Sequence, residues 1–396
     1  MKVLFVQKEP LLTAALQLTL LRQGYEVIFC KEAGLALNLI KNNPNLKPER
    51  TKSKEIGLEL SFFDGRLGFD ASYYNTLTFD EILPVRVSSA TGYTNEYLNA
   101  GSIRNKGVEL TLNGTPVRAK DFNWNIRVNF SHNANKVESL YKDGSGNEAQ
   151  NLNLGTFQNG ESINAPLGGS LGTIRGSDYT YLNGKKVVGP DGQYILTTTN
   201  NNPIGSTNPD WIAGINNSFK YKSFTFSFLI DIRKGGSVFS QDMAYGLATG
   251  LYPETAYTND LGNPVRSPLT NDSKSGGFIR PGVYANGQPN TTRIAADDYT
   301  AFGYVSLPDK AWIYDASYIK LREALIGYTL PESITKKFGA VKGITLQLIG
   351  HNLWIIHKNL PYADPEDSIS AGNLQGIQEV SYPSVRTISF NLKATF

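Results

Sequence analysis

The side chains best suited to binding a ligand are aromatic residues in polar stretches of the chain. Tyr179, Tyr181 and Trp312 stand in or beside segments rich in Gly, Asn, Pro, Ser and Thr. Flat rings of this kind can stack on sugar rings, so we name these three as candidate ligand-stacking aromatics. The alternative is packing, or membership of the Tyr and Trp belts that membrane proteins place at the lipid–water boundary.

Acidic side chains gather in residues 359–370, which include Asp364, Glu366 and Asp367. Carboxylate and amide oxygens could bind Ca²⁺ there, or a sugar; the alternative is a solvated loop. No Ser/His/Asp triad, paired carboxylates or phosphate-binding loop can be argued from the sequence. We therefore name no catalytic, metal or cofactor-binding residue, and we do not expect an enzyme.

The composition favours strands and turns over helices. Of 396 residues, 18% are charged and 11% are aromatic, with 38 Gly, 21 Tyr and 19 Phe, which suits pleated strands and tight turns. The net charge of +3 comes with no basic stripe, so nucleic acid is not an expected partner. The lone Cys30 excludes an internal disulfide and a multi-cysteine metal site.

The elements that must position these residues are long strands with a period of two. Apolar and polar residues alternate, and the polar positions include Arg, Lys, Asp and Asn. A membrane-spanning strand needs only about 9–11 residues with every second one apolar. Backbone groups in lipid must all be paired, so such strands close into a barrel. A large soluble β-sandwich is the alternative. The clearest alternating runs are residues 56–62, 67–73, 108–112, 122–130, 224–232 and 388–396.

Connections of two lengths separate the runs. Asp64-Gly65 and Lys222-Ser223 predict short turns, whereas residues 151–173, 181–209 and 243–308 are long and polar. Outer-membrane barrels have short turns on the periplasmic side and long loops outside, so we expect the long segments to be extracellular loops.

The first 43 residues are of a different kind. Residues 3–6 and 25–30 predict two buried strands, and two helical patterns follow them, which indicates a parallel β-α-β-α unit. The stretch resembles the start of a response-regulator receiver domain. Where receivers carry an acidic pair it reads Gln7-Lys8-Glu9, and the strand with the phosphoacceptor is missing, so phosphotransfer is not expected. A signal peptide is the rival reading, but no small-x-small cleavage site follows closely.

The rest of the chain resembles the SusC/RagA-type receptors that are linked to TonB. The resemblance is carried by phrases such as "NPNLKPERTKSKEIGLEL" (43–60), "DASYIKLREALIGYTLP" (315–331) and "SYPSVRTISFNLKATF" (381–396). It implies a plug and a 22-stranded barrel in the outer membrane of Bacteroidetes. It also implies uptake of oligosaccharides or peptides, a SusD-like surface lipoprotein as partner, and TonB as the energy source. The alternating terminal strand with Phe390, Leu392 and Phe396 looks like the signal that barrel-insertion machinery reads.

We therefore predict a mainly β chain, with a truncated receiver-like segment at 1–43 and the C-terminal part of a transmembrane antiparallel β-barrel at 44–396. An incomplete barrel leaves open strand edges that lipid cannot satisfy, so we expect an incomplete or chimeric reading frame that does not transport by itself. Two other functions stay open: signalling through a degenerate receiver segment, and a secreted carbohydrate-binding β-protein.

Overall fold

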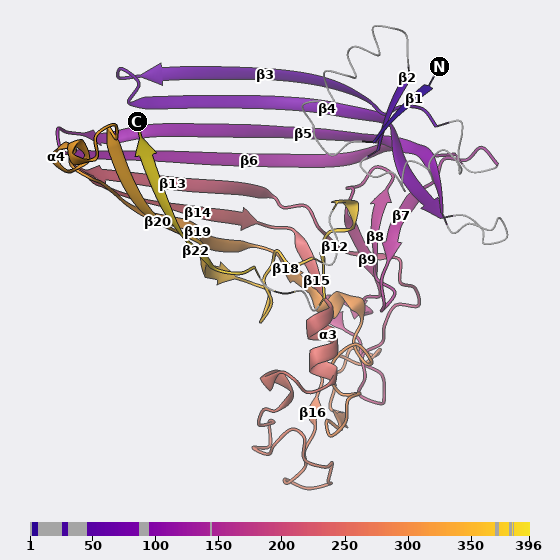
Figure 1. The fold of residues 1–396 in the computed structure, drawn as a ribbon. Helices are drawn as coiled ribbons and strands as arrows, with labels where there is room; N and C mark the ends of the chain where they lie inside the picture. Colours follow the sequence, from indigo (N-terminus) through magenta and orange to yellow (C-terminus); the bar gives the residue numbers. More distant parts are fainter. Residues whose placement is uncertain are drawn as a thin grey trace.

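A nine-stranded antiparallel sheet dominates the protein, which was studied as a computed structural model describing residues 2–6, 26–30, 46–86, 95–142, 145–368, 372–379, 382 and 384–396. The sheet curves, and β3 and β22 form its two open edges (Figure 1). Its spatial order is β22-β20-β19-β14-β13-β6-β5-β4-β3. The strands are β3 (Arg50–Phe62), β4 (Leu67–Arg86), β5 (Asn95–Arg118), β6 (Phe122–Leu140), β13 (Trp211–Tyr221), β14 (Phe224–Lys234), β19 (Tyr318–Thr329), β20 (Gly343–Lys358) and β22 (Thr387–Thr395).

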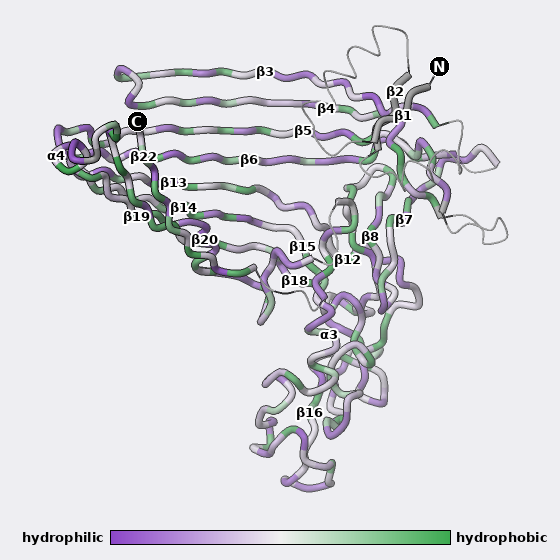
Figure 2. Tube along the Cα trace, viewed as in Figure 1, coloured by the Kyte–Doolittle hydropathy of each residue, from purple (hydrophilic) through white to green (hydrophobic). Residues whose placement is uncertain are grey.

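The pairing register gives the sheet two chemically different faces. One row across eight strands is apolar throughout, and we call the face that carries it the outer face: Leu60, Phe69, Leu112, Val128, Ile215, Ile230, Leu321 and Trp354. The next row, on the opposite or inner face, is almost entirely polar: Glu59, Asp70, Thr111, Asn129, Gly214, Asp231, Lys320 and Ile355. Figure 2 shows the resulting alternation along β3–β6. The predicted period of two is confirmed.

The outer face is exposed and rich in aromatic residues. Trp124 stacks on Phe219 with ring centroids 5.8 Å apart, and Phe219 stacks on Phe226 at 6.1 Å. Large apolar side chains there stay uncovered; Ile326 is 59% exposed and Leu348 is 51% exposed. An exposed apolar surface that extends over so many strands needs an apolar environment.

Short turns and long connections alternate along the chain, as predicted. At the β3–β4 hairpin, Phe63 and Asp64 adopt positive φ and Gly65 completes the turn at φ 77. Lys222, also at positive φ, makes the turn between β13 and β14. These turns lie at one end of the sheet, and the long connections leave from the other end (Figure 1).

The long connections fold into a lobe, which corrects the expectation of plain loops. Four strands form a second sheet in the order β12-β9-β8-β7, and β15 pairs with both β18 and β21. A core of Ile163, Ile174, Phe239, Met243 and Trp312 joins them. The polar composition of these segments hid short strands whose apolar residues meet only in three dimensions. The elements are β7 (Asn151–Thr156), β8 (Ser162–Pro166), β9 (Thr173–Gly176), β10 (Tyr181–Leu182), β11 (Lys185–Lys186), β12 (Asn202–Ser206), β15 (Ser237–Ser240), α3 (Gln241–Ala248), η2 (Pro253–Thr255), β16 (Phe278–Ile279), β17 (Arg293–Ile294), η3 (Asp309–Trp312), β18 (Ile313–Asp315), η5 (Gly372–Leu374) and β21 (Ile377–Gln378).

Two features complete the fold. β1 (Lys2–Val6) pairs in parallel with β2 (Glu26–Cys30), which agrees with the two strands predicted there; the two predicted helices lie outside the described residues. At the short-turn end, α4 (Glu332–Thr335) and η4 (Lys336–Phe338) connect β19 to β20. No helix among the described residues is long and apolar enough to cross a membrane.

Candidate functional site

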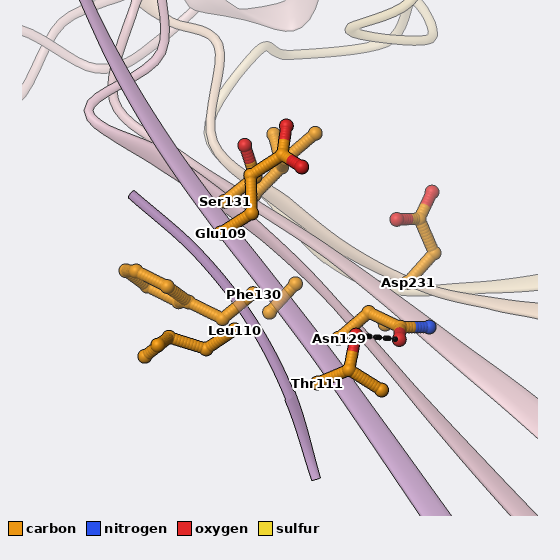
Figure 3. A pocket seen from close by; sticks show the side chains of 10 residues that line it. Glu109, Leu110, Thr111, Asn129, Phe130, Ser131 and Asp231 are labelled. Atoms are coloured by element: carbon orange, nitrogen blue, oxygen red, sulfur yellow. Dashed lines mark hydrogen bonds between the residues drawn. The ribbon is translucent and has the colours of Figure 1, made fainter. Parts of the chain in front are cut away.

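The inner face of the sheet holds a hollow of about 250 Å³. Thr111, Asn129 and Asp231 border it on one side of their strands, whereas Leu110 and Phe130 lie on the other side (Figure 3). Thr111 Oγ1 donates to Asn129 Oδ1 at 3.1 Å. Hydroxyl, amide and carboxylate groups side by side can hydrogen-bond a polar ligand.

Beside this hollow, a charge cluster joins the barrel wall to the connection that follows β20. We call it the Lys320 cluster. Lys320 Nζ donates to Asp364 Oδ1 and to Glu366 Oε2, both at 2.5 Å. Arg322 Nε donates to Asp231 Oδ2 at 2.7 Å, and its Nη2 also bonds the Glu366 carboxylate. The cluster therefore fastens residues 364–366 to β14 and β19.

Two side chains of the Lys320 cluster are almost completely shielded from solvent, which strengthens the interactions between its charges. The side chains of Lys320 and Asp364 are only 4% and 2% exposed. Burial raises the pKa of Glu366, but the hydrogen bonds from Arg322 and Lys320 outweigh it and hold the pKa to about 2. The carboxylate is thus ionised at any physiological pH, and the connection stays pinned to the wall.

This arrangement decides between the alternatives for residues 359–370. The Lys320 ammonium group stands between Asp364 and Glu366. Among the residues that the structure describes, no group of three His, Cys, Asp or Glu side chains is placed to hold a metal ion. Asp364 and Glu366 are therefore bound to the wall through Lys320 and Arg322 and are not free carboxylates of a solvated loop.

The three candidate stacking aromatics are all in the lobe, where the rings of Tyr179 and Tyr181 are neighbours with centroids 6.2 Å apart, while Trp312 lies in the core. The Trp312 ring is 2% exposed and packs in the lobe core, so it has no free face for a ligand. Tyr179 is 6% exposed, and Lys186 Nζ lies 3.6 Å from its ring centroid. Tyr181 is 48% exposed. Ligand stacking stays a prediction for Tyr181, whereas burial argues against it for the other two rings.

Phe390 and Leu392 lie on one face of β22, and Phe396 directly follows the last residue of this strand. Phe390, Leu392 and Phe396 are 69%, 60% and 72% exposed, and Phe390 pairs with Leu348 of the outer face. Their recognition by insertion machinery stays a prediction.

Sequence reasoning missed Lys320 and Arg322. Their signal was present, because two basic residues interrupt the apolar rhythm of "YIKLREALIGYT". Their partners Asp364 and Glu366 lie more than forty positions away in a segment without regular structure, and no local pattern connects the two.

The chain is similar to several known proteins. A family model described as TonB dependent receptor-like, beta-barrel, matches residues 22–259. TonB-dependent receptor P26 of Formosa agariphila is 30% identical, over 92% of this chain and 36% of that protein. TonB-dependent receptor SusC of Bacteroides thetaiotaomicron is 25% identical, over 58% of this chain and 24% of that protein. A solved structure of the RagAB peptide transporter has the same fold, with a TM-score of 0.61 at 18% identity, over 89% of this chain and 36% of that one. The chain thus spans about a third of the length of P26.

Proposed function

The chain belongs to the TonB-dependent receptor-like β-barrel family, and from this premise we propose that it forms part of the wall of an outer-membrane receptor that takes up oligosaccharides or peptides. The observation that carries the proposal is the two-faced sheet. Its outer row is apolar over eight strands while six of the eight residues in the adjacent inner row are polar, which suits lipid on one side and a wet passage on the other.

The substrate class is proposed from the relatives and from the inner face. One relative of known structure is titled a peptide transporter. The hydroxyl, amide and carboxylate groups around Thr111, Asn129 and Asp231 could hydrogen-bond a peptide or a glycan equally well. A strongly apolar substrate would leave these groups without partners and would be disfavoured.

The partners follow from the same family. We propose a SusD-like surface lipoprotein above the lobe, TonB as the energy-coupling partner, and barrel-insertion machinery acting on the terminal strand. The long connections that build the lobe leave from one end of the sheet (Figure 1), which supports the lobe as the extracellular side.

Transport belongs, in this proposal, to a whole receptor to which these strands contribute. We further propose that residues 1–43 take no part in phosphotransfer, because Gln7-Lys8-Glu9 offers one carboxylate where Mg²⁺ needs several oxygens. The family match begins at residue 22, within this stretch. Neither a signalling role nor a secreted carbohydrate-binding role is favoured by any structural observation.

A gene deletion in the encoding organism tests the proposed uptake. The deletion strain is grown with defined oligopeptides or defined oligosaccharides as the sole carbon source, beside a monosaccharide control. We expect growth to fail on one of the two oligomer classes and to persist on the monosaccharide. Unaltered growth on both classes, with the protein recovered in the soluble fraction, would contradict the proposal.

A further inference from the structure

The outer face changes character toward the long-connection end of β3–β6. The row Ile56, Tyr73, Val108 and His132 is the last that is mainly apolar. The register puts two basic rows directly beyond it. The first contains Lys54, Asn75, Lys106 and Ala134, and the second contains Lys52, Leu77, Arg104 and Lys136. We call the Lys and Arg side chains of these two rows the basic belt.

The belt is placed on one face only. The inner-face row between its two rows contains Ser53, Thr76, Asn105 and Asn135, none of which is charged. The Ser53 and Thr76 hydroxyls are 2.8 Å apart and share a hydrogen bond. Lysines that served only solubility would be expected on the wet inner face as well. Because these lysines lie only on the outer face, we relate them to the environment that covers the outer face.

The belt keeps a surplus of positive charge. Arg104 is paired with Glu138 and also donates to Asn75 Oδ1 at 2.9 Å. In the part of the chain that the structure describes, no ion pair involves Lys52, Lys54, Lys106 or Lys136, and Lys54, Lys106 and Lys136 are exposed.

Apolar side chains are interleaved with these cations. Lys52 Nζ lies 5.4 Å from the ring centroid of Phe79, and Leu77 stands between Lys52 and Arg104 in the register. A surface that mixes cations with aliphatic and aromatic groups, next to a mainly apolar band, matches the level where lipid chains end and headgroups begin.

We propose that the basic belt binds the phosphate groups of an anionic membrane lipid in the leaflet on the long-connection side. Charge complementarity favours this occupant, because ammonium and guanidinium groups attract phosphate oxygens, and the adjoining apolar rows would hold its acyl chains. The inference rests on the proposed membrane placement of the outer face and adds to it a preference for phosphorylated headgroups.

A lipid-retention experiment tests the belt. The whole receptor to which this chain contributes is folded into phosphatidylcholine bilayers containing lipid A with two phosphates, or its dephosphorylated form, and is then extracted in mild detergent. Lipid bound per protein is counted by mass spectrometry. The test variant carries K52Q, K54Q, K106Q and K136Q. The control carries K120Q, K220Q, K222Q and K342Q, an equal loss of charge toward the short-turn end.

We expect the test variant to retain at least about tenfold less bisphosphorylated lipid than the wild type, and the control to retain the wild-type amount. Dephosphorylated lipid should be held weakly and equally by all three proteins. If the test variant retained as much phosphorylated lipid as the wild type, the proposed lipid site would be wrong. It would also be wrong if the test variant kept its lipid but lost a protein that co-purifies with the wild type. Failure of every protein, the wild type included, to enter bilayers would refute the membrane placement instead.

Discussion

Lys320 is the residue on which the inner wall depends most. Its buried ammonium group neutralises Asp364 and shares Glu366 with Arg322. Buried ion pairs contribute little net stability compared with apolar packing. Removal of one partner, however, leaves the other charge buried without a counter-charge.

Lys320→Met should therefore lower the free energy of unfolding by about 3–5 kcal/mol. It should also free residues 364–366 for protease cleavage. Arg50→Gln is the control, because the Arg50 side chain is 73% exposed in its pair with Asp80, and its loss should cost about 0–1 kcal/mol. Urea unfolding followed by tryptophan fluorescence measures both. Equal costs for the two variants would show that the cluster is solvated.

Glu161 is a second residue whose burial has a consequence. Its side chain has no exposed surface, and it accepts a hydrogen bond from Gln241 Nε2 at 2.9 Å. Burial raises the pKa of Glu161 above its ordinary 4.5 despite that hydrogen bond. The folded lobe therefore holds the proton more tightly than the unfolded chain does.

The sign of the pH effect follows from this shift. Stability from a raised carboxyl pKa is complete below about pH 4.5 and declines as pH rises through the folded-state pKa. Amide exchange of α3 should thus become faster between pH 5 and pH 8, after correction for intrinsic rates. Glu161→Gln should flatten that dependence, and Glu332→Gln, at an exposed position, should leave it unchanged. A wild-type profile that is flat over this interval would contradict the account.

At the scale of elements, neighbouring residues of β14 lie on opposite faces of the sheet and have different surroundings. Phe226 lies on the aromatic outer face, 43% exposed and stacked with Phe219, whereas Ser227 lies on the inner face. An arginine in the lipid-facing band costs about 2–4 kcal/mol near the bilayer midplane, and one in the wet interior costs far less.

Phe226 lies near the short-turn end of β14, so Phe226→Arg should make folding into bilayers less favourable by about 1–2 kcal/mol, while Ser227→Arg should change the folding free energy by less than about 1 kcal/mol. Reversible urea titration in phospholipid vesicles provides the measurement. If the inner-face variant were the more damaging of the two, the assignment of the faces would be reversed.

The lobe is a separate element of stability with Trp312 at its centre. Because the ring is 2% exposed, Trp312→Ala should open a cavity and cost the lobe about 3–5 kcal/mol. The sheet should be unaffected, since Trp312 packs with Ile163, Ile174 and Phe239 of the lobe. Proteolysis should cut the lobe first, and the barrel strands should keep their resistance. Loss of ligand binding without any gain in cleavage would favour the stacking role instead.

These elements show which parts of the structure can be predicted from the amino-acid sequence. A period of two is a local property, so strands such as β6 and β14 and the Asp64-Gly65 turn could be predicted from neighbouring residues alone. The lobe could not, because Ile163, Phe239 and Ile377 come from segments far apart in sequence. The burial of Trp312 depends on the same long-range contacts, because its neighbours in space are apolar residues of distant segments.

For the whole molecule, the sheet, the Lys320 cluster and the lobe have different roles in the proposed receptor. In that proposal the outer face contacts lipid, and the inner face offers polar groups to a passing ligand. The cluster keeps the connection after β20 against the wall, and the lobe gathers the long segments at one end (Figure 1). All of these roles depend on lipid covering one face only.

Lipid contact along β14 can be measured position by position. Single cysteines are placed at residues 224–231 in a Cys30→Ser background, labelled with an environment-sensitive fluorophore, and the protein is folded into vesicles whose acyl chains carry bromine. Quenching should be strong at 224, 226, 228 and 230 and weak at 225, 227, 229 and 231. Equal quenching at odd and even positions, or none at either, would contradict the lipid-facing sheet.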